Sequence, residues 1–189
     1  MRSIAKEKII HQLLQLSTLT DRYMQLDVAY PDKALAWLLE TEKQLESLRL
    51  PVVSKLSVLR GLLIAIDDGY QDPSISDVSR GKRKAKRALA AYIISQAEQV
   101  LREEVDFIDH QFAELIDKLS QLLAISFAQQ ELPATPQITM PYVDKVWSLM
   151  SQNQETKSMF RYIQARVGET DRRYLLQALL VNMLSHNSN

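Results

Sequence analysis

The fold is decided by residues 101–122, LREEVDFIDHQFAELIDKLSQL, which lie between Gly81 and Pro133 in a stretch without glycine or proline. Apolar side chains recur there in alternating steps of four and three residues, the spacing of one helix face. Such a seam over about three heptads is typical of a coiled coil or of a bundle helix. The seam consists of Leu101, Val105, Ile108, Phe112, Leu115, Leu119 and Leu122.

The absence of breakers on both sides of this seam predicts one long helix over residues 77–128. At ~1.5 Å per residue such a helix is about 75–80 Å long, which is too long for a compact domain of this size. We therefore expect that one end projects, that the helix bends, or that a partner covers it. Gly81 and the cations beside it weaken the first turns, so regular helix is expected to begin near Lys84.

Helical spacing continues on either side of the long helix. The chain has too few turn residues for a strand-rich fold, with four glycines and six prolines. In the third predicted helix, residues 62–66 are apolar all round, which places that helix at the centre of the bundle. Gly168 is expected to be a left-handed helix terminator, and Thr170 the N-cap of the last helix. The helices are expected at 3–25, from 31 to about 48, at 51–68, from 141, at 155–167 and at 171–185.

These elements predict an all-α protein, a helical bundle organised around the long helix, with a small C-terminal three-helix unit. The domain boundaries are expected at 1–130 for the bundle and 140–189 for the C-terminal unit. A linker containing Pro133 and Pro136 joins them. The sequence is consistent with two separate units and with two units packed as one body. No family resemblance emerges from the sequence.

Composition narrows the possible functions. The chain has 189 residues, 46% of them hydrophobic, and its 23 basic and 23 acidic residues cancel, so any attraction to a charged partner must be local. Without cysteine there is no disulfide or thiol chemistry, which fits a reducing, cytoplasmic location. The longest apolar run, residues 88–94, is far too short for a membrane span.

The segment most suggestive of function is the basic run, which we define as residues 80–87. Such a run binds nucleic-acid phosphates, an anionic membrane surface or an acidic protein, or it is simply a solvated helix start. Cations at a helix N-terminus oppose the helix dipole, so an offsetting charge is expected, from Asp67, Asp68, Asp72 and Asp77 or from a partner. The binding candidates are Arg80, Lys82, Arg83, Lys84, Lys86 and Arg87.

The same predicted helix is acidic further along. Between Arg102 and Lys118 it carries acidic residues and neither lysine nor arginine. This segregation of charge, together with the apolar seam, suggests antiparallel pairing with a second copy or with an internal helix. The acidic residues are Glu103, Glu104, Asp106, Asp109, Glu114 and Asp117.

Two further candidates are weaker. His110 lies four residues from both Asp106 and Glu114 and so shares a helix face with them, but the Glu-x-x-His spacing of di-iron bundles is absent, and we expect no metal. A secondary basic patch near the C-terminus is a candidate for DNA contact by a helix-turn-helix, although hairpins of this kind are common without DNA. That patch consists of Arg161, Arg166, Arg172 and Arg173.

The sequence contains none of the motifs that mark common catalytic sites: no glycine-rich phosphate loop, no G-x-S-x-G and no H-E-x-x-H. We therefore expect no enzymatic activity and no cofactor. The predicted role is that of a non-catalytic adaptor, regulatory or assembly subunit acting through its long helix on a protein partner or a second copy. The alternative is a nucleic-acid-binding accessory protein that places the basic run on phosphates.

Overall fold

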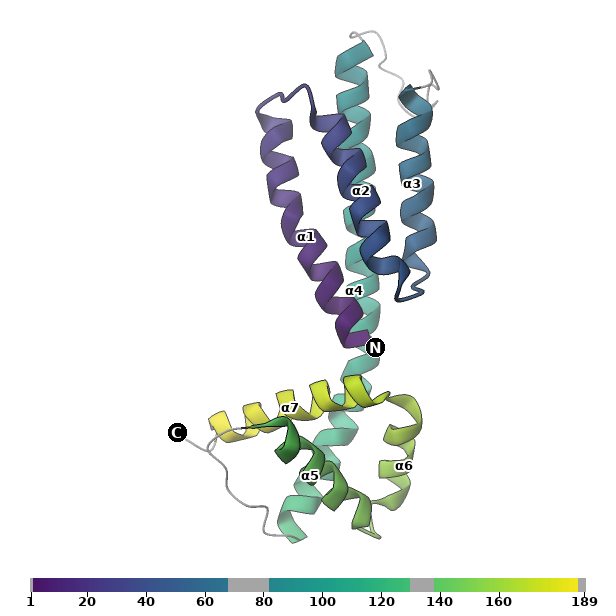
Figure 1. The fold of residues 1–189 in the computed structure, drawn as a ribbon. Coiled ribbons are helices and arrows are strands. Elements are labelled where there is room, and N and C mark those ends of the chain that lie inside the picture. Colours follow the sequence, from purple (N-terminus) through teal and green to yellow (C-terminus); the bar gives the residue numbers. More distant parts are fainter. Residues whose placement is uncertain (1, 68–81, 130–137, 187–189) are drawn as a thin grey trace. The chain divides into compact units, whose positions relative to one another are not determined.

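A computed structural model describes residues 2–67, 82–129 and 138–186 (Figure 1). Within these ranges the chain forms seven helices and no strand, which confirms the all-α prediction. The helices are α1 (Arg2–Met24), α2 (Tyr30–Glu46), α3 (Val52–Asp67), α4 (Lys82–Gln129), α5 (Met140–Gln152), α6 (Lys157–Arg166) and α7 (Glu169–His186).

Helix α4 is the predicted long helix, with 48 residues. Its C-terminal end agrees with the prediction to one residue, whereas the predicted first turn, residues 77–81, lies outside the described part of the chain. The apolar seam is buried, with Val105 as the one partly exposed member. The spacing of four and three residues therefore identified the buried face correctly.

The chain divides into two compact units, and the division falls inside α4. One unit comprises residues 4–107. The other comprises residues 108–189 together with the first three residues. The contacts thus group residues 108–129 with the C-terminal helices, whereas the prediction placed these residues in a bundle that extends from 1 to 130. The assignment of two domains itself stays a prediction.

In the N-terminal unit, α1, α2 and α3 lie alongside the first part of α4 (Figure 1). Buried polar contacts join α1 to α2: the Trp37 indole N–H donates to the Gln12 carbonyl at 3.2 Å, and the Thr41 hydroxyl to the Gln12 side chain at 3.1 Å. Helices α2 and α3 are joined by Glu42, which accepts hydrogen bonds from Ser57 and Arg60, both at 2.8 Å. These bonds satisfy polar groups that would otherwise be costly to bury.

The prediction that α3 lies at the centre of the bundle is wrong. Leu63 is buried, but Leu62 and Ile64 are more than a third exposed, and Val58 is 64% exposed. The reason is that α3 packs through one face, on which Leu56 and Leu63 lie seven residues apart. An apolar sequence thus did not mean that the helix was surrounded.

In the C-terminal unit, α5, α6 and α7 lie beside the second part of α4 (Figure 1). The aromatic rings of Trp147 in α5 and Phe160 in α6 lie with centroids 4.4 Å apart. Phe112 in α4 faces Tyr174 in α7 at 6.5 Å. These contacts belong to an apolar core within the C-terminal unit.

The start of α7 differs from the prediction. Gly168 does not adopt the left-handed backbone of a terminator. Its carbonyl accepts the first bond of α7, from the Arg172 amide at 2.9 Å, so Gly168 occupies the N-cap position and α7 begins at Glu169. Thr170 is therefore inside the helix and is not its cap.

Candidate functional site

The basic run is only partly described. Arg80 and Gly81 lie outside the described residues, and only the backbone of Lys82 is placed, in the first turn of α4. Arg83 and Lys84 are exposed, whereas Lys86 and Arg87 are half-buried. The run therefore has a solvent-facing part and a part that packs against the rest of the N-terminal unit.

The half-buried cations have partners on α1 and α2. The Lys86 ammonium lies 3.8 Å from the Asp32 carboxylate, and the Arg87 guanidinium lies 5.1 Å from the centre of the Tyr23 ring. These contacts are a weak ion pair and a cation–π interaction. The carboxylates expected to offset the run, those of Asp67, Asp68, Asp72 and Asp77, lie outside the described side chains.

The basic run also lines a groove of about 300 Å³ beside the turn that joins α1 to α2. Four of its cations face this groove, which contains two carboxylates, so its local charge is positive. The groove is lined by Leu26, Asp27, Val28, Pro31, Asp32, Arg83, Lys84, Lys86 and Arg87.

The turn itself is held by hydrogen bonds. The Asp27 carboxylate accepts from the Ala29 amide at 2.9 Å and from the Arg22 guanidinium at 2.8 Å, and these bonds hold the pKa of Asp27 below its usual value. Leu26 has a φ of 59°, in the left-handed region. That conformation costs about 1 kcal/mol for a residue other than glycine, and it turns Leu26 outward at the end of α1.

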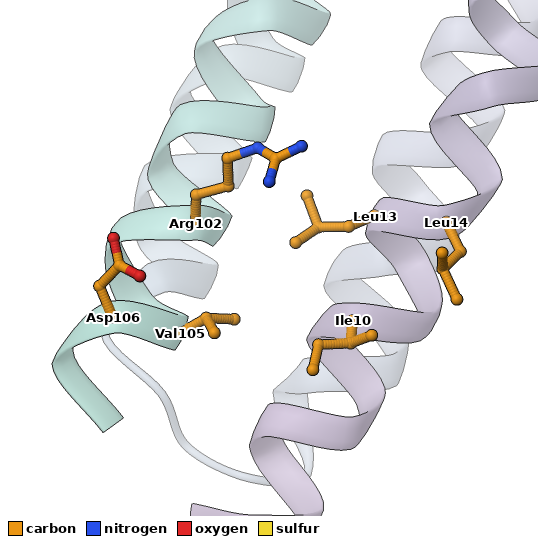
Figure 2. Close-up of a pocket in the computed structure, with 6 residues that line it drawn as sticks. All are labelled: Ile10, Leu13, Leu14, Arg102, Val105 and Asp106. Atoms are coloured by element: carbon orange, nitrogen blue, oxygen red, sulfur yellow. The ribbon is translucent and has the colours of Figure 1, made fainter. Parts of the chain in front are cut away.

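A second groove, of about 350 Å³, lies between α1 and α4 (Figure 2). Ile10 and Leu13 from α1 face Val105 and the Arg102 side chain from α4 across this space. The lining is largely aliphatic and part of it is open to solvent, since Leu14 is 70% exposed. A surface of this kind is suited to an apolar partner.

Polar side chains of α4 line a neighbouring hollow that shares Arg102 and Asp106 with the second groove. Arg102 pairs with Glu98 one helical turn away at 2.7 Å, and Glu103 accepts a hydrogen bond from Gln99 at 3.0 Å. Asp106 lies at the edge of the groove and is exposed. Three carboxylates and one guanidinium leave this neighbouring hollow negatively charged.

The secondary basic patch is engaged in ion pairs within the C-terminal unit. The Arg166 guanidinium lies 3.2 Å from the Glu114 carboxylate. The Arg173 guanidinium forms a bidentate ion pair with the Asp144 carboxylate, in which both hydrogen bonds measure 2.9 Å. The bond from Arg173 holds the pKa of Asp144 below its ordinary value. Arg172 lies 4.9 Å from the Trp147 ring, and Arg161 is exposed. Three of these guanidinium groups are thus already occupied by neighbouring side chains.

His110 is exposed on α4, and Asp106 and Glu114 on the same face do not form a metal site with it. Glu114 instead accepts a hydrogen bond from the Tyr162 hydroxyl, which lowers the pKa of Glu114 and raises that of Tyr162. Among residues 2–67, 82–129 and 138–186 no group of three or more metal-binding side chains occurs. Within the same ranges, no helix has both the length and the apolarity that crossing a bilayer requires.

Sequence reasoning missed the residues that border the basic run. Leu26 and Val28 alternate with charged or small residues just before Pro31, a pattern that marks a turn but does not say which helix lies beside it. It also missed the groove between α1 and α4, whose two walls lie about 90 residues apart in the chain. Only the tertiary contacts bring these groups together.

No protein-family model matches the chain, and comparison with curated proteins and with solved structures gives no match. Function is therefore inferred from the contacts, exposure and charge of the described residues.

Proposed function

We propose that the protein is a non-catalytic helical adaptor or assembly subunit that acts through protein–protein contacts of α4. The observation that carries this proposal is the groove between α1 and α4, whose lining includes the exposed side chains of Leu14 and Ile10. Grooves of this kind accept the apolar face of a partner helix, and covering them removes aliphatic surface from water.

The charge along the groove indicates the chemistry of the partner. Arg102 and Asp106 lie on the α4 wall of the groove. The same two residues also line a neighbouring hollow on α4 together with Glu98 and Glu103, and Arg102 pairs there with Glu98. A partner helix with an apolar stripe flanked by lysine or arginine complements both the lining of the groove and the acidic hollow beside it, whereas an acidic helix is repelled. We therefore propose a basic amphipathic helix of another protein as the occupant.

The test uses a photocrosslinking amino acid at position 14 in the full-length protein, expressed in its native cells. The matched control carries the same crosslinker at position 58, where Val58 on α3 is similarly exposed. A protein crosslinked from position 14 and not from position 58 is then purified, and its affinity is measured. Leu14→Glu should weaken binding at least tenfold and Val58→Glu should not.

Three outcomes contradict this proposal. The first is that position 14 crosslinks no protein. The second is that Leu14→Glu and Val58→Glu weaken binding equally. The third is that light scattering shows a mass that doubles with concentration in the wild type and not in Leu14→Glu. In that case the groove pairs two copies of this chain.

The alternative, an accessory protein whose basic run binds nucleic-acid phosphates, is the weaker proposal. Exposed Arg83 and Lys84 are compatible with phosphate contact. The side chains beside them, however, are the aliphatic Leu26 and Val28 and not groups that stack on bases. No specific observation favours nucleic acid over other anionic partners.

A further inference from the structure

The turn between α1 and α2 exposes aliphatic side chains at alternate positions. Met24, Leu26 and Val28 are 73%, 63% and 77% exposed, among the highest values for large apolar residues in the described chain. Single exposed apolar residues are ordinary, but several at one turn indicate a contact surface.

This turn is built to hold its apolar side chains outward. The Asp27 carboxylate, between Leu26 and Val28 in the chain, accepts hydrogen bonds from the Ala29 amide and from the Arg22 guanidinium. The left-handed backbone of Leu26 is further held by the bond from its amide to the Tyr23 carbonyl at 3.2 Å. The aliphatic groups are therefore presented in a defined geometry before any partner arrives, which reduces the entropy lost on binding.

Cations from the start of α4 lie against the same turn. Leu26 and Val28 line one groove together with Arg83 and Lys84. Arg83 and Lys84 are exposed and form no ion pair with any described carboxylate. We call the surface formed by Leu26, Val28, Arg83 and Lys84 the basic–apolar tip.

We propose that the basic–apolar tip binds the surface of an anionic lipid bilayer. Aliphatic side chains enter the boundary between headgroups and acyl chains, while adjacent lysine and arginine side chains meet lipid phosphates and carboxylates. A nucleic acid offers partners to the cations only and leaves Leu26 and Val28 in water. A bilayer satisfies both kinds of group at once, which is why the observations favour it. This surface is distinct from the groove between α1 and α4.

The test measures sedimentation of the full-length protein with vesicles of phosphatidylcholine containing 30 mol% phosphatidylserine, and with vesicles of phosphatidylcholine alone. We expect binding to the first kind of vesicle and none to the second. Because each cation near an anionic surface contributes about fivefold to partitioning, Arg83→Glu with Lys84→Glu should lower binding about 25-fold or more. Leu26→Asn with Val28→Ser should lower it about tenfold without changing the net charge.

Matched controls separate a local surface from general effects. Lys43→Glu with Lys55→Glu makes the same change in net charge at exposed positions on α2 and α3. Val58→Ser removes an equally exposed aliphatic group from α3. Neither control should reduce vesicle binding more than twofold. Circular dichroism of each variant should match the wild type, and asparagine at position 26 suits the left-handed backbone there.

Several results overturn the proposal. The proposal fails if the wild type does not bind anionic vesicles at 50 mM salt. It also fails if Lys43→Glu with Lys55→Glu loses as much vesicle binding as Arg83→Glu with Lys84→Glu. If Leu26→Asn with Val28→Ser leaves vesicle binding unchanged, the apolar half of the proposal fails. If the wild type binds double-stranded DNA more tightly than vesicles and that variant binds DNA equally well, the surface is a nucleic-acid site.

Discussion

Replacing Asp171 tests the reasoning about buried charge most directly. Asp171 lies in the first turn of α7 and is 4% exposed. Its carboxylate accepts hydrogen bonds from the amides of Arg2 and Ser3 at 2.9 Å and from the Ser3 hydroxyl at 2.6 Å. One negative charge therefore lies at the N-termini of α1 and α7, where both helix dipoles stabilise it.

The size of the effect follows from these three bonds. At about 1 kcal/mol net for each hydrogen bond, and more where the acceptor is charged, Asp171→Ala should lower the free energy of unfolding by about 3 kcal/mol. Ser3→Ala removes the hydroxyl bond alone and should cost about 1 kcal/mol. Asp171→Asn retains one oxygen but turns an amide donor toward the Arg2 N–H. The free energy of unfolding is therefore expected to fall by about 2 kcal/mol.

The pH dependence has a defined sign. Burial raises the pKa of Asp171, but hydrogen bonds, among them those from Ser3 and Arg2, outweigh burial and lower the pKa to about 2 from 3.8. A depressed carboxyl pKa stabilises the folded state above the unfolded value, and this stabilisation is lost as pH falls from about 4 to 2. After allowance for solvent screening it amounts to about 1–2 kcal/mol. The advantage of the wild type over Asp171→Asn should shrink across that window.

The assay is urea unfolding followed by tryptophan fluorescence. The chain has two tryptophans, Trp37 in the N-terminal unit and Trp147 in the C-terminal unit, so a Trp37→Phe background isolates the unit that contains Asp171. The matched control is Asp117→Asn, which removes an exposed carboxylate bonded to Gln121 and should change stability by less than about 0.5 kcal/mol. A cost below 1 kcal/mol for Asp171→Ala would show that these hydrogen bonds contribute little net stability. If the difference in unfolding free energy between wild type and Asp171→Asn is unchanged from pH 5 to pH 2, the pKa of Asp171 is not lowered in the folded state.

Three further predictions concern the packing. Burial raises the pKa of Tyr30 to about 12. Absorbance at 295 nm should therefore show one tyrosine that titrates near that pH, and this titration step should be absent in Tyr30→Phe. The stability that Tyr30 contributes is complete below pH 10 and lost as pH rises toward 12. A Cβ added to Gly61, inside α3, meets nothing within 4 Å, so Gly61→Ala should stabilise the protein by about 0.5–1 kcal/mol in urea unfolding; a loss of stability would contradict this. Leu119 is fully buried, and Leu119→Ala should cost about 2–5 kcal/mol in the same assay, whereas a cost below 1 kcal/mol would mean that this part of the seam is not packed.

The residues that the sequence located well are those whose role depends on local periodicity. Leu101, Ile108 and Leu119 were assigned to the buried face because helical geometry alone places them on one side. The prediction that α3 lies at the centre of the bundle was wrong because the apolarity of a helix does not reveal how many neighbours it has. Leu62, for example, remains partly exposed. Gly168 was misassigned because a glycine between two helices can end the first or cap the second.

The candidate surfaces were harder to predict. The basic run was evident from composition, but its neighbours Leu26 and Val28 lie on another element more than fifty residues earlier. Asp171 appeared to be an ordinary residue of a helix start, and its contact with Ser3 spans 168 residues of sequence. No local pattern encodes such pairings, because they depend on where whole helices meet.

The sequence alone thus determined that the chain is helical, which face of α4 is buried, and that a cluster of cations begins this helix. These properties follow from residue spacing of about 3.6 per turn and from the scarcity of glycine and proline. The tertiary structure decided which helices cover that face, which aliphatic groups lie beside the cations, and that a groove remains open between α1 and α4. Those outcomes depend on the packing of side chains distant in sequence, where many arrangements bury similar apolar area and only the full set of contacts selects one.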